Sequence, residues 1–274
     1  MKQLLKLLAL NKAAPRRFEI VKAEAGNEAT VYLYDVIVGT DEEAAWWGGV
    51  SAQSFVKEIR GLEADVIHLR INSPGGDVFA ARAMEQALRE HTAKIITHID
   101  GYAASAASYL ALAGDEVEIA AGGFFMIHKA WTYAYGNADD LTTTAGLLEK
   151  IDESLVATYA TETGQDAEQL REWMRAETWL NSDEAVQYGF ADRVATGAVK
   201  DATAWDLSAY ERAPNAKKTI TMNVNVDASK IREMIEDALS KMSPVLDQSQ
   251  QTPISETQNT DELLRHLELA VLPA

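Results

Sequence analysis

A serine and a histidine in this sequence each follow an apolar run that is typical of a buried strand. Ser105 lies in the segment 101–108, where glycine and alanine surround it, and His128 follows the run 124–127. A serine without bulky neighbours can present its hydroxyl to a substrate carbonyl, and an imidazole at a strand end can take the hydroxyl proton near neutral pH. The two residues predict a nucleophile and its general base. Ser108 is the alternative nucleophile, although a hydroxyl inside a helix more often bonds back to the backbone.

Backbone amides that could hold an anion lie in two of these turns. Residues 72–77 read Asn-Ser-Pro-Gly-Gly-Asp and precede a predicted helix. Adjacent glycines adopt backbone angles closed to other residues and leave amides uncovered, and the start of a helix adds positive potential. Amides of this turn, together with the amide of Ala106 directly after the serine, could therefore face a developing anion.

Each of these segments also has a purely structural interpretation: a tight turn, a close helix contact, or a strand-end histidine in the core. Their combination after successive strands favours acyl transfer. The other histidines are weaker candidates, and no two have the spacing of a helical zinc site. They are His68 and His98 within strands, His91 at a helix end, and His266 near the C-terminus.

The elements that must position these residues alternate along the chain. Short β-branched or apolar runs predict strands over 31–38, 65–71, 94–100, 117–120 and 124–127. Apolar residues at helical spacing predict helices over 51–59, 78–91, 103–112, 140–161, 166–175 and 183–188. Repeated strand-turn-helix units indicate an α/β fold with a largely parallel sheet.

Composition excludes several classes of function. The 274 residues carry 25 Lys and Arg against 42 Asp and Glu, so the formal net charge is −17 and attraction to nucleic acid or anionic lipid is not expected. The absence of cysteine excludes disulfides, thiolate zinc sites and a cysteine nucleophile. No run of apolar residues is long enough to cross a bilayer.

The pattern divides the chain into three parts. Residues 1–17 form a short amphipathic lead-in, residues 18–195 form the α/β domain, and residues 196–274 form an extended, partly helical C-terminal tail. Within the tail we expect an amphipathic helix over 228–242, a polar linker over 243–260 and a short helix over 261–271.

Five motifs, in this order, resemble those of the Clp protease proteolytic subunit. They lie at 71–76, 101–106, 126–128, 136–141 and 184–192, and the similarity spans about residues 18–195. The resemblance implies a serine endopeptidase of the ClpP/crotonase-like fold. It also implies that Ser105 is the nucleophile, that His128 is the base, and that the amides of Gly76 and Ala106 form the oxyanion hole.

The third member of the triad is where this sequence departs from that family. The family has an aspartate just before an aromatic-Leu-Ser stretch, and the matching residues 175–181 read Arg-Ala-Glu-Thr-Trp-Leu-Asn. Glu177 is the acid at that place, and a glutamate can orient a histidine as an aspartate does. A surface glutamate at a helix end is the structural alternative. Asp183 and Asp152 are alternative acids.

Three features resemble the phage and prophage ClpP-related head-maturation proteases. They are the sequence Ala-Glu-Thr-Trp-Leu at 176–180, the Ala-Trp pair after Lys129 and the acidic tail. That resemblance implies cleavage of scaffold or capsid precursors, in the host cytoplasm or in an assembling prohead, by a homo-oligomeric ring. No cofactor, metal, nucleic acid or membrane is expected as a partner. The sequence shows no clear match to the N-terminal loop that engages an ATPase, so a need for an unfoldase does not follow.

Two other functions stay open at this point. A crotonase-type acyl-CoA hydratase or isomerase would also use two backbone amides, but with carboxylates as acid and base. A non-catalytic capsid-assembly protein could retain the fold. The Ser105 and His128 motifs speak against the first of these alternatives.

Overall fold

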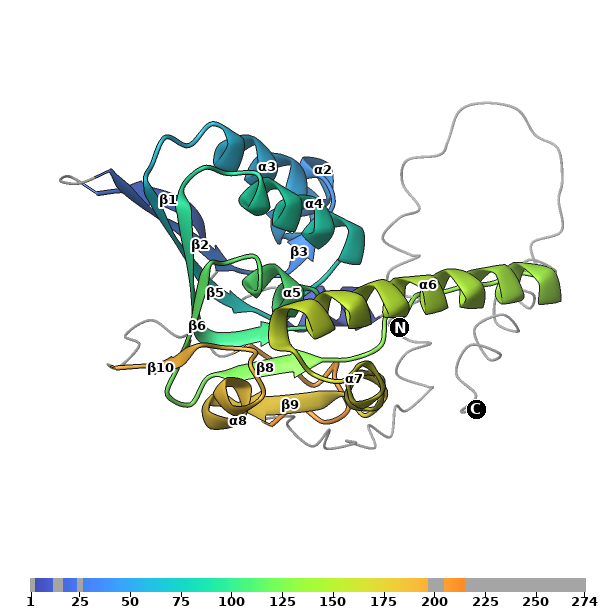
Figure 1. The fold of residues 1–274 in the computed structure, drawn as a ribbon. Helices are drawn as coiled ribbons and strands as arrows, with labels where there is room; N and C mark the ends of the chain where they lie inside the picture. Colours follow the sequence, from blue (N-terminus) through green and yellow to red (C-terminus); the bar gives the residue numbers. More distant parts are fainter. Residues whose placement is uncertain (1–2, 12–16, 24–26, 197–204, 215–274) are drawn as a thin grey trace, which may run out of the picture. The chain divides into compact units, whose positions relative to one another are not determined.

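The main sheet places five strands side by side in parallel. The computed structural model describes residues 3–11, 17–23, 27–196 and 205–214. The parallel strands, in spatial order, are β2 (Glu28–Tyr34), β5 (Val66–Ser73), β6 (Lys94–Ala104), β7 (Glu116–Ala120) and β10 (Arg193–Ala195). The strand β1 (Arg17–Lys22) is antiparallel to β2 at one edge. Figure 1 shows helices packed along this sheet, which confirms the predicted α/β fold class.

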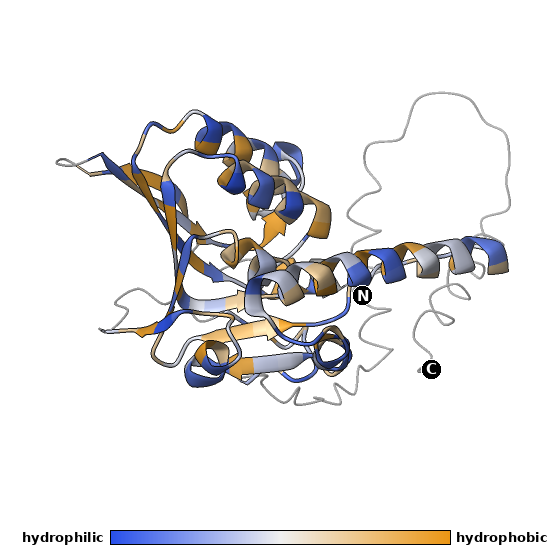
Figure 2. Ribbon diagram, viewed as in Figure 1, coloured by the Kyte–Doolittle hydropathy of each residue, from blue (hydrophilic) through white to orange (hydrophobic). Residues whose placement is uncertain are grey.

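Strand β5 shows how the two faces of the sheet differ. Ile67, Leu69 and Ile71 are fully buried in the main core, whereas His68 and Arg70 between them are partly exposed on the other face. In Figure 2 the strands carry much of the apolar colour and the helices are mixed, as amphipathic helices should be. The helices that contribute to this core include α3 (Ala52–Arg60), α4 (Val78–Arg89) and α5 (Ala106–Ala111).

The longest helix in the described part of the chain is α6 (Ala138–Thr163), which runs past the end of the sheet in Figure 1. Asn137 caps its start, and Gly164 ends it in the left-handed conformation. Only the C-terminal half of α6 contributes buried residues to the fold. After it come α7 (Ala167–Arg175), β9 (Thr178–Asn181) and α8 (Ser182–Gln187).

Strand β6 is shared between two neighbours, and this sharing positions the site. Its first part, up to Ile99, pairs in parallel with β7, and its last residues, Tyr102–Ala104, pair in parallel with β8 (Phe124–Ile127). The strand β9 is antiparallel to β8. The carboxyl ends of β5, β6 and β8 therefore lie next to one another in the sheet. Gly76, Ser105 and His128 follow these three strand ends.

Several element boundaries differ from the sequence prediction. The predicted strand 31–38 is broken after Tyr34, because the carboxylate of Asp35 accepts the amides of Val36 (2.7 Å) and Gly49 (3.1 Å) and turns the chain. The short β3 (Ile37–Val38) then pairs with β4 (Val50–Ser51). The predicted helix 103–112 starts later, since the residues up to Ala104 extend β6.

Helix α2 (Asp41–Trp47) was not predicted, although Thr40 and Glu43 form a capping box at its start. The lead-in contains α1 (Gln3–Leu10), and Leu7 of this helix packs with residues of the 205–214 segment. The predicted helices 228–242 and 261–271 and the linker between them lie outside the described residues.

Candidate active site

Ser105 occupies a strained turn between β6 and α5. Its φ of 54° is one of two positive φ values among the described non-glycine residues, and its ψ is −124°. Such a conformation costs on the order of 1–3 kcal/mol and persists only where its surroundings impose it. The amide of Ser105 donates to the carbonyl of Met126 at 2.9 Å, which ties the turn to β8. The hydroxyl is thereby presented beyond the end of the strand, as at other nucleophile turns.

His128 is in direct contact with this serine. Because Ala104 lies opposite Met126 in the parallel β6–β8 register, the residues that follow the two strands meet, and Nε2 of His128 lies 2.7 Å from Oγ of Ser105. Desolvation by the surrounding protein lowers the pKa of His128 to about 4, against a smaller opposing effect of the Asp152 carboxylate. At neutral pH the imidazole is therefore uncharged and can accept the hydroxyl proton.

The two adjacent glycines after β5 fit against β3. Gly75 and Gly76 have φ values of +89° and +155°. The amide of Ile37 donates to the carbonyl of Gly75 (2.9 Å), and the carbonyl of Ile37 accepts from the amide of Asp77 (3.0 Å). A Cβ on Gly76 would lie 2.0 Å from the carbonyl oxygen of Ile37. Only glycine can occupy this position without moving the backbone.

The two predicted oxyanion-hole turns are in van der Waals contact. A Cβ on Gly75 would lie 2.5 Å from the carbonyl oxygen of Ala104 and 2.8 Å from the amide nitrogen of Ala106. In the described part of the chain, no hydrogen bond uses the amide of Gly76 or of Ala106. The structure thus brings together the serine, the histidine and two unpaired amides that the sequence singled out.

The predicted acid Glu177 is held elsewhere. Its carboxylate accepts from the amides of Arg212 (2.7 Å) and Glu211 (3.1 Å) and from the indole of Trp179 (3.2 Å). Among the bonds of the described residues, none joins Glu177 to His128. In this structure Glu177 therefore does not bond to the histidine as the third member of a catalytic triad.

Asp152, one of the alternative acids, is the carboxylate whose charge acts on His128. It projects from α6, is buried, and accepts the amide of Ala130 at 2.7 Å. Its other oxygen lies 3.2 Å from Nζ of Lys129. Asp183, the other alternative, lies in the first turn of α8, and none of the described bonds connects it to His128.

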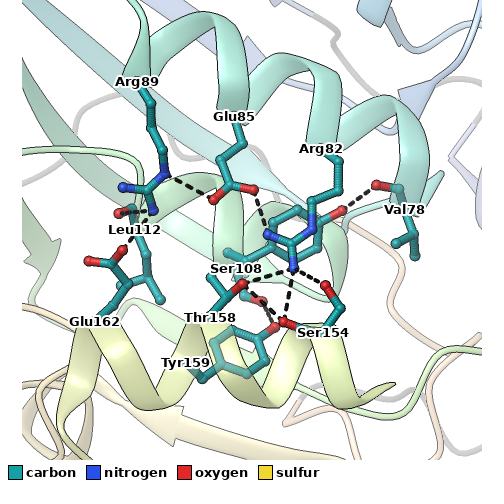
Figure 3. A network of polar contacts seen from close by, with 11 residues as sticks. Val78, Arg82, Glu85, Arg89, Ser108, Leu112, Ser154, Thr158, Tyr159 and Glu162 are labelled. Atoms are coloured by element: carbon teal, nitrogen blue, oxygen red, sulfur yellow. Dashed lines mark hydrogen bonds and ion pairs between the residues drawn. The ribbon is translucent and has the colours of Figure 1, made fainter. Parts of the chain in front are cut away.

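Ser108, the alternative nucleophile, belongs to the scaffold behind the site. Its hydroxyl donates to the carbonyl of Ser105 (2.5 Å) and lies 2.6 Å from the hydroxyl of Tyr159 on α6. Figure 3 shows this contact beside a separate set of bonds in which Arg82 of α4 reaches Thr158 at 2.9 Å. The first contact joins α5 to α6, and the second joins α4 to α6.

An apolar groove leads to the serine and the histidine. Phe79 and Tyr133 lie along it and are 63% and 60% exposed, so they can contact a bound molecule. Its other lining residues include Gly76, Trp131, Leu147, Leu148 and Ile151. This arrangement suits an extended chain with apolar side chains.

Sequence reasoning missed one aromatic residue of the site, Tyr210, because it lies in the predicted tail. Its ring packs edge-on against the ring of His128, with centroids 5.5 Å apart and an interplanar angle of 88°. The only hint was the aromatic and apolar spacing of Trp205, Leu207 and Tyr210.

The remaining histidines lie away from the groove. Nδ1 of His68 lies 3.0 Å from Nε2 of His98 on the sheet face opposite the main core, and His91 contacts the carbonyl of Leu62. His266 lies outside the described residues. Within the described ranges, no cluster of three or more His, Asp or Glu side chains could hold a metal ion. None of the helices described is long and apolar enough to span a membrane.

Comparisons with known proteins identify the family. Residues 49–198 match the Clp protease family. The ATP-dependent Clp protease proteolytic subunit of Deinococcus radiodurans is 31% identical over 161 residues, which cover 58% of this chain and 78% of the relative. Proteolytic subunit 3 of the same protease from Rhodococcus jostii is 33% identical over 132 residues, covering 47% of this chain and 65% of the relative. This chain belongs to the Clp protease family.

Proposed function

We propose that this protein is a serine endopeptidase in which Ser105 is the nucleophile and His128 the general base. The observation that carries the proposal is the 2.7 Å contact between Oγ of Ser105 and Nε2 of His128 beside two unpaired amides. The low pKa of His128 keeps its ring ready to accept a proton at neutral pH. Membership of the Clp protease family supports the same chemistry.

The proposed reaction proceeds through an acyl-enzyme. Oγ of Ser105 attacks the peptide carbonyl carbon while its proton passes to Nε2 of His128. The amides of Gly76 and Ala106 stabilise the oxyanion of the tetrahedral intermediate. His128 then returns the proton to the leaving nitrogen as the C–N bond breaks. Water, deprotonated by the same imidazole, attacks the ester carbon, and His128 returns this proton to Oγ of Ser105 as the ester bond breaks, which releases the second product and the free serine.

A carboxylate is needed near His128 because the imidazolium formed in each step carries a positive charge. Asp152 supplies a negative charge that raises the pKa of His128, and so favours this intermediate. The triad predicted from the family pattern would use Glu177 instead. In the present arrangement that carboxylate accepts bonds from the 211–212 backbone. We therefore propose that Asp152 acts through its charge.

Covalent labelling tests the proposal directly. A fluorophosphonate should modify Ser105, with intact mass showing one adduct and peptide mapping giving its position. Ser105→Ala should abolish both the adduct and hydrolysis of an unfolded protein substrate. The matched control is Ser154→Ala, which removes an exposed serine of α6 and should react like the wild type. Labelling that survives Ser105→Ala would overturn the assignment.

The crotonase-type alternative is disfavoured by the same contact, because a hydratase of that kind needs no serine bonded to a histidine. An absence of labelling together with acyl-CoA binding would support it. A non-catalytic assembly role would be supported if wild type, Ser105→Ala and His128→Ala all leave candidate precursors uncut.

We also propose that subunits assemble into a homo-oligomeric ring, in the cytoplasm or in an assembling prohead, and cut scaffold or capsid precursors. The exposed leucines of α6, Leu141 (45% exposed) and Leu147 (50% exposed), offer apolar contacts for such assembly. The support for head maturation is the similarity of residues 176–180, of the Ala-Trp pair after Lys129 and of the acidic tail to phage and prophage proteases. Co-expression with the products of neighbouring genes tests it, since precursors should stay uncut only with Ser105→Ala.

A further inference from the structure

Residues 205–214, here called the 205–214 segment, cover an apolar patch on the sheet directly beside the active site. Side chains alternate along strands, so while Ala103 and Phe125 enter the main core, Ala104 and Met126 point to the opposite face. There they form a second buried cluster. The cluster consists of Leu7, Ala104, Met126, Trp205, Leu207, Tyr210 and Ala213.

Tyr210 is the member of this cluster that reaches the reacting groups. It is 3% exposed, and its hydroxyl donates to the carbonyl of Pro74, one residue before the Gly75–Gly76 turn. Its ring stands edge-on between the ring of His128 (5.5 Å) and that of Trp179 (5.8 Å). One side chain thus contacts both the turn that carries Gly76 and the base His128.

Glu177 fastens the chain immediately after Tyr210. Its two carboxylate oxygens accept the amides of Glu211 and Arg212, and the guanidinium of Arg212 donates to the carbonyl of Ala176 at 2.6 Å. Glu177 has a φ of 48°, the other positive value among the described non-glycine residues. Such a strained conformation persists where neighbouring contacts impose it, and here those contacts hold the 205–214 segment in place.

A second set of bonds fixes the other end of the segment. The indole of Trp205 donates to the carbonyl of Asn72 at 2.9 Å, and the amide of Asp206 donates to the side chain of Asn11 at 2.7 Å. The segment is therefore fixed on both sides of Tyr210. Its position does not depend on the tyrosine alone.

We propose that Tyr210 is a positioning residue for the Ser105–His128 pair and that Glu177 acts on the site by anchoring Tyr210 through the backbone of the 205–214 segment. The inference rests on the proposed peptidase function. An edge-on ring limits rotation of the imidazole and excludes water from one of its sides, and the phenol hydroxyl fixes the turn that carries the oxyanion hole. Both effects act on the chemical step more than on substrate binding.

The first test separates positioning from folding. Tyr210→Phe keeps the ring and loses the hydroxyl, so kcat should fall about tenfold with KM within about twofold. Tyr210→Ala also opens the side of the imidazole to water. This change should raise the pKa of His128 toward its ordinary value and move the acid limb of the rate profile up by about one pH unit or more. Tyr32→Phe, a partly exposed tyrosine of β2 outside the groove, is the matched control and should leave both measurements unchanged. A folded Tyr210→Ala protein with wild-type kcat and an unmoved acid limb would overturn the proposal.

The second test asks whether Glu177 acts through Tyr210. Glu177→Ala alone should lower kcat, but in a Tyr210→Ala background it should have almost no further effect, because the anchored group is gone. If Glu177 instead orients His128 directly, its loss should cost as much in both backgrounds, and the inference fails. Glu177→Gln keeps one acceptor oxygen for a backbone amide and should be intermediate.

One readout is independent of peptidase activity. Histidine NMR can follow the titration of His128 in protein that is not turning over. If wild type is never labelled at Ser105 while Tyr210→Ala still raises the pKa of His128, the peptidase proposal fails and the positioning contact stands. If labelling is normal and the pKa of His128 is the same in both proteins, the positioning inference fails alone.

Discussion

The depressed pKa of His128 makes a quantitative prediction about the pH dependence of Ser105 reactivity. The ordinary pKa of a histidine is 6.5, whereas His128 in its desolvated site titrates at about 4. At pH 5.5 a base with a pKa of 4 is roughly 97% deprotonated, and one with a pKa of 6.5 is roughly 9% deprotonated. The two possibilities differ about tenfold in the rate of Ser105 labelling at that pH.

The assay is the second-order rate of fluorophosphonate labelling between pH 3.5 and 8, read by intact mass after quenching. Because the free enzyme reacts, the acid limb reports His128 without interference from substrate binding. We expect a plateau down to about pH 5 and a tenfold fall per pH unit below about 4. His128→Ala, the control, should be slow and lack this limb. A wild-type limb centred near 6.5 would refute the reasoning that burial dominates the environment of His128.

Four further predictions follow from the same geometry. Gly76→Ala should reduce labelling 100-fold or more, because its Cβ would meet the Ile37 carbonyl oxygen at 2.0 Å, whereas Gly146→Ala, with open space around it, should label normally. Asp152→Asn removes the charge that raises the pKa of His128, so the acid limb should move lower, and an upward shift would contradict its proposed role. The pKa of His128 is lower in the folded state than in the unfolded chain, so protonation favours unfolding. As pH falls from 6.5 through 4, the free energy of unfolding of the wild type should therefore decrease relative to His128→Gln, by up to roughly 3 kcal/mol. Urea denaturation at fixed protein concentration measures this difference. Leu141→Glu should lower the native mass of any oligomer, because Leu141 is exposed on α6 and lies outside the groove, and an unchanged mass would show that this face of α6 is not a subunit contact.

Local patterns in the sequence were sufficient for much of the fold. The alternation in β5 and the apolar runs of β7 and β8 predicted strands, and helical spacing predicted α6 within two residues of its bounds. These features depend on neighbours in the chain, and so does the need for glycine at a crowded turn. The strand β9 was missed because a four-residue segment carries almost no periodicity, and its pairing with β8 stabilises it.

The residue types and order of Gly76, Ser105, Ala106 and His128 were readable from the sequence, because the first three follow strands in glycine or small-residue turns and His128 directly follows an apolar strand. Their meeting was decided only by tertiary structure. Strand β6 exchanges β7 for β8 as its neighbour part-way along, and this exchange brings the ends of β6 and β8 together.

The sequence also could not show which groups the carboxylates of Glu177 and Asp152 contact. The family pattern pointed to Glu177, yet the carboxylate bonds to amides 34 and 35 residues away, in a segment that composition assigned to the tail. Asp152 comes to the site because α6 packs its C-terminal half on the core. Periodicity and spacing describe what a residue does near its own position in the chain. Which distant backbone a carboxylate finds depends on how the elements pack.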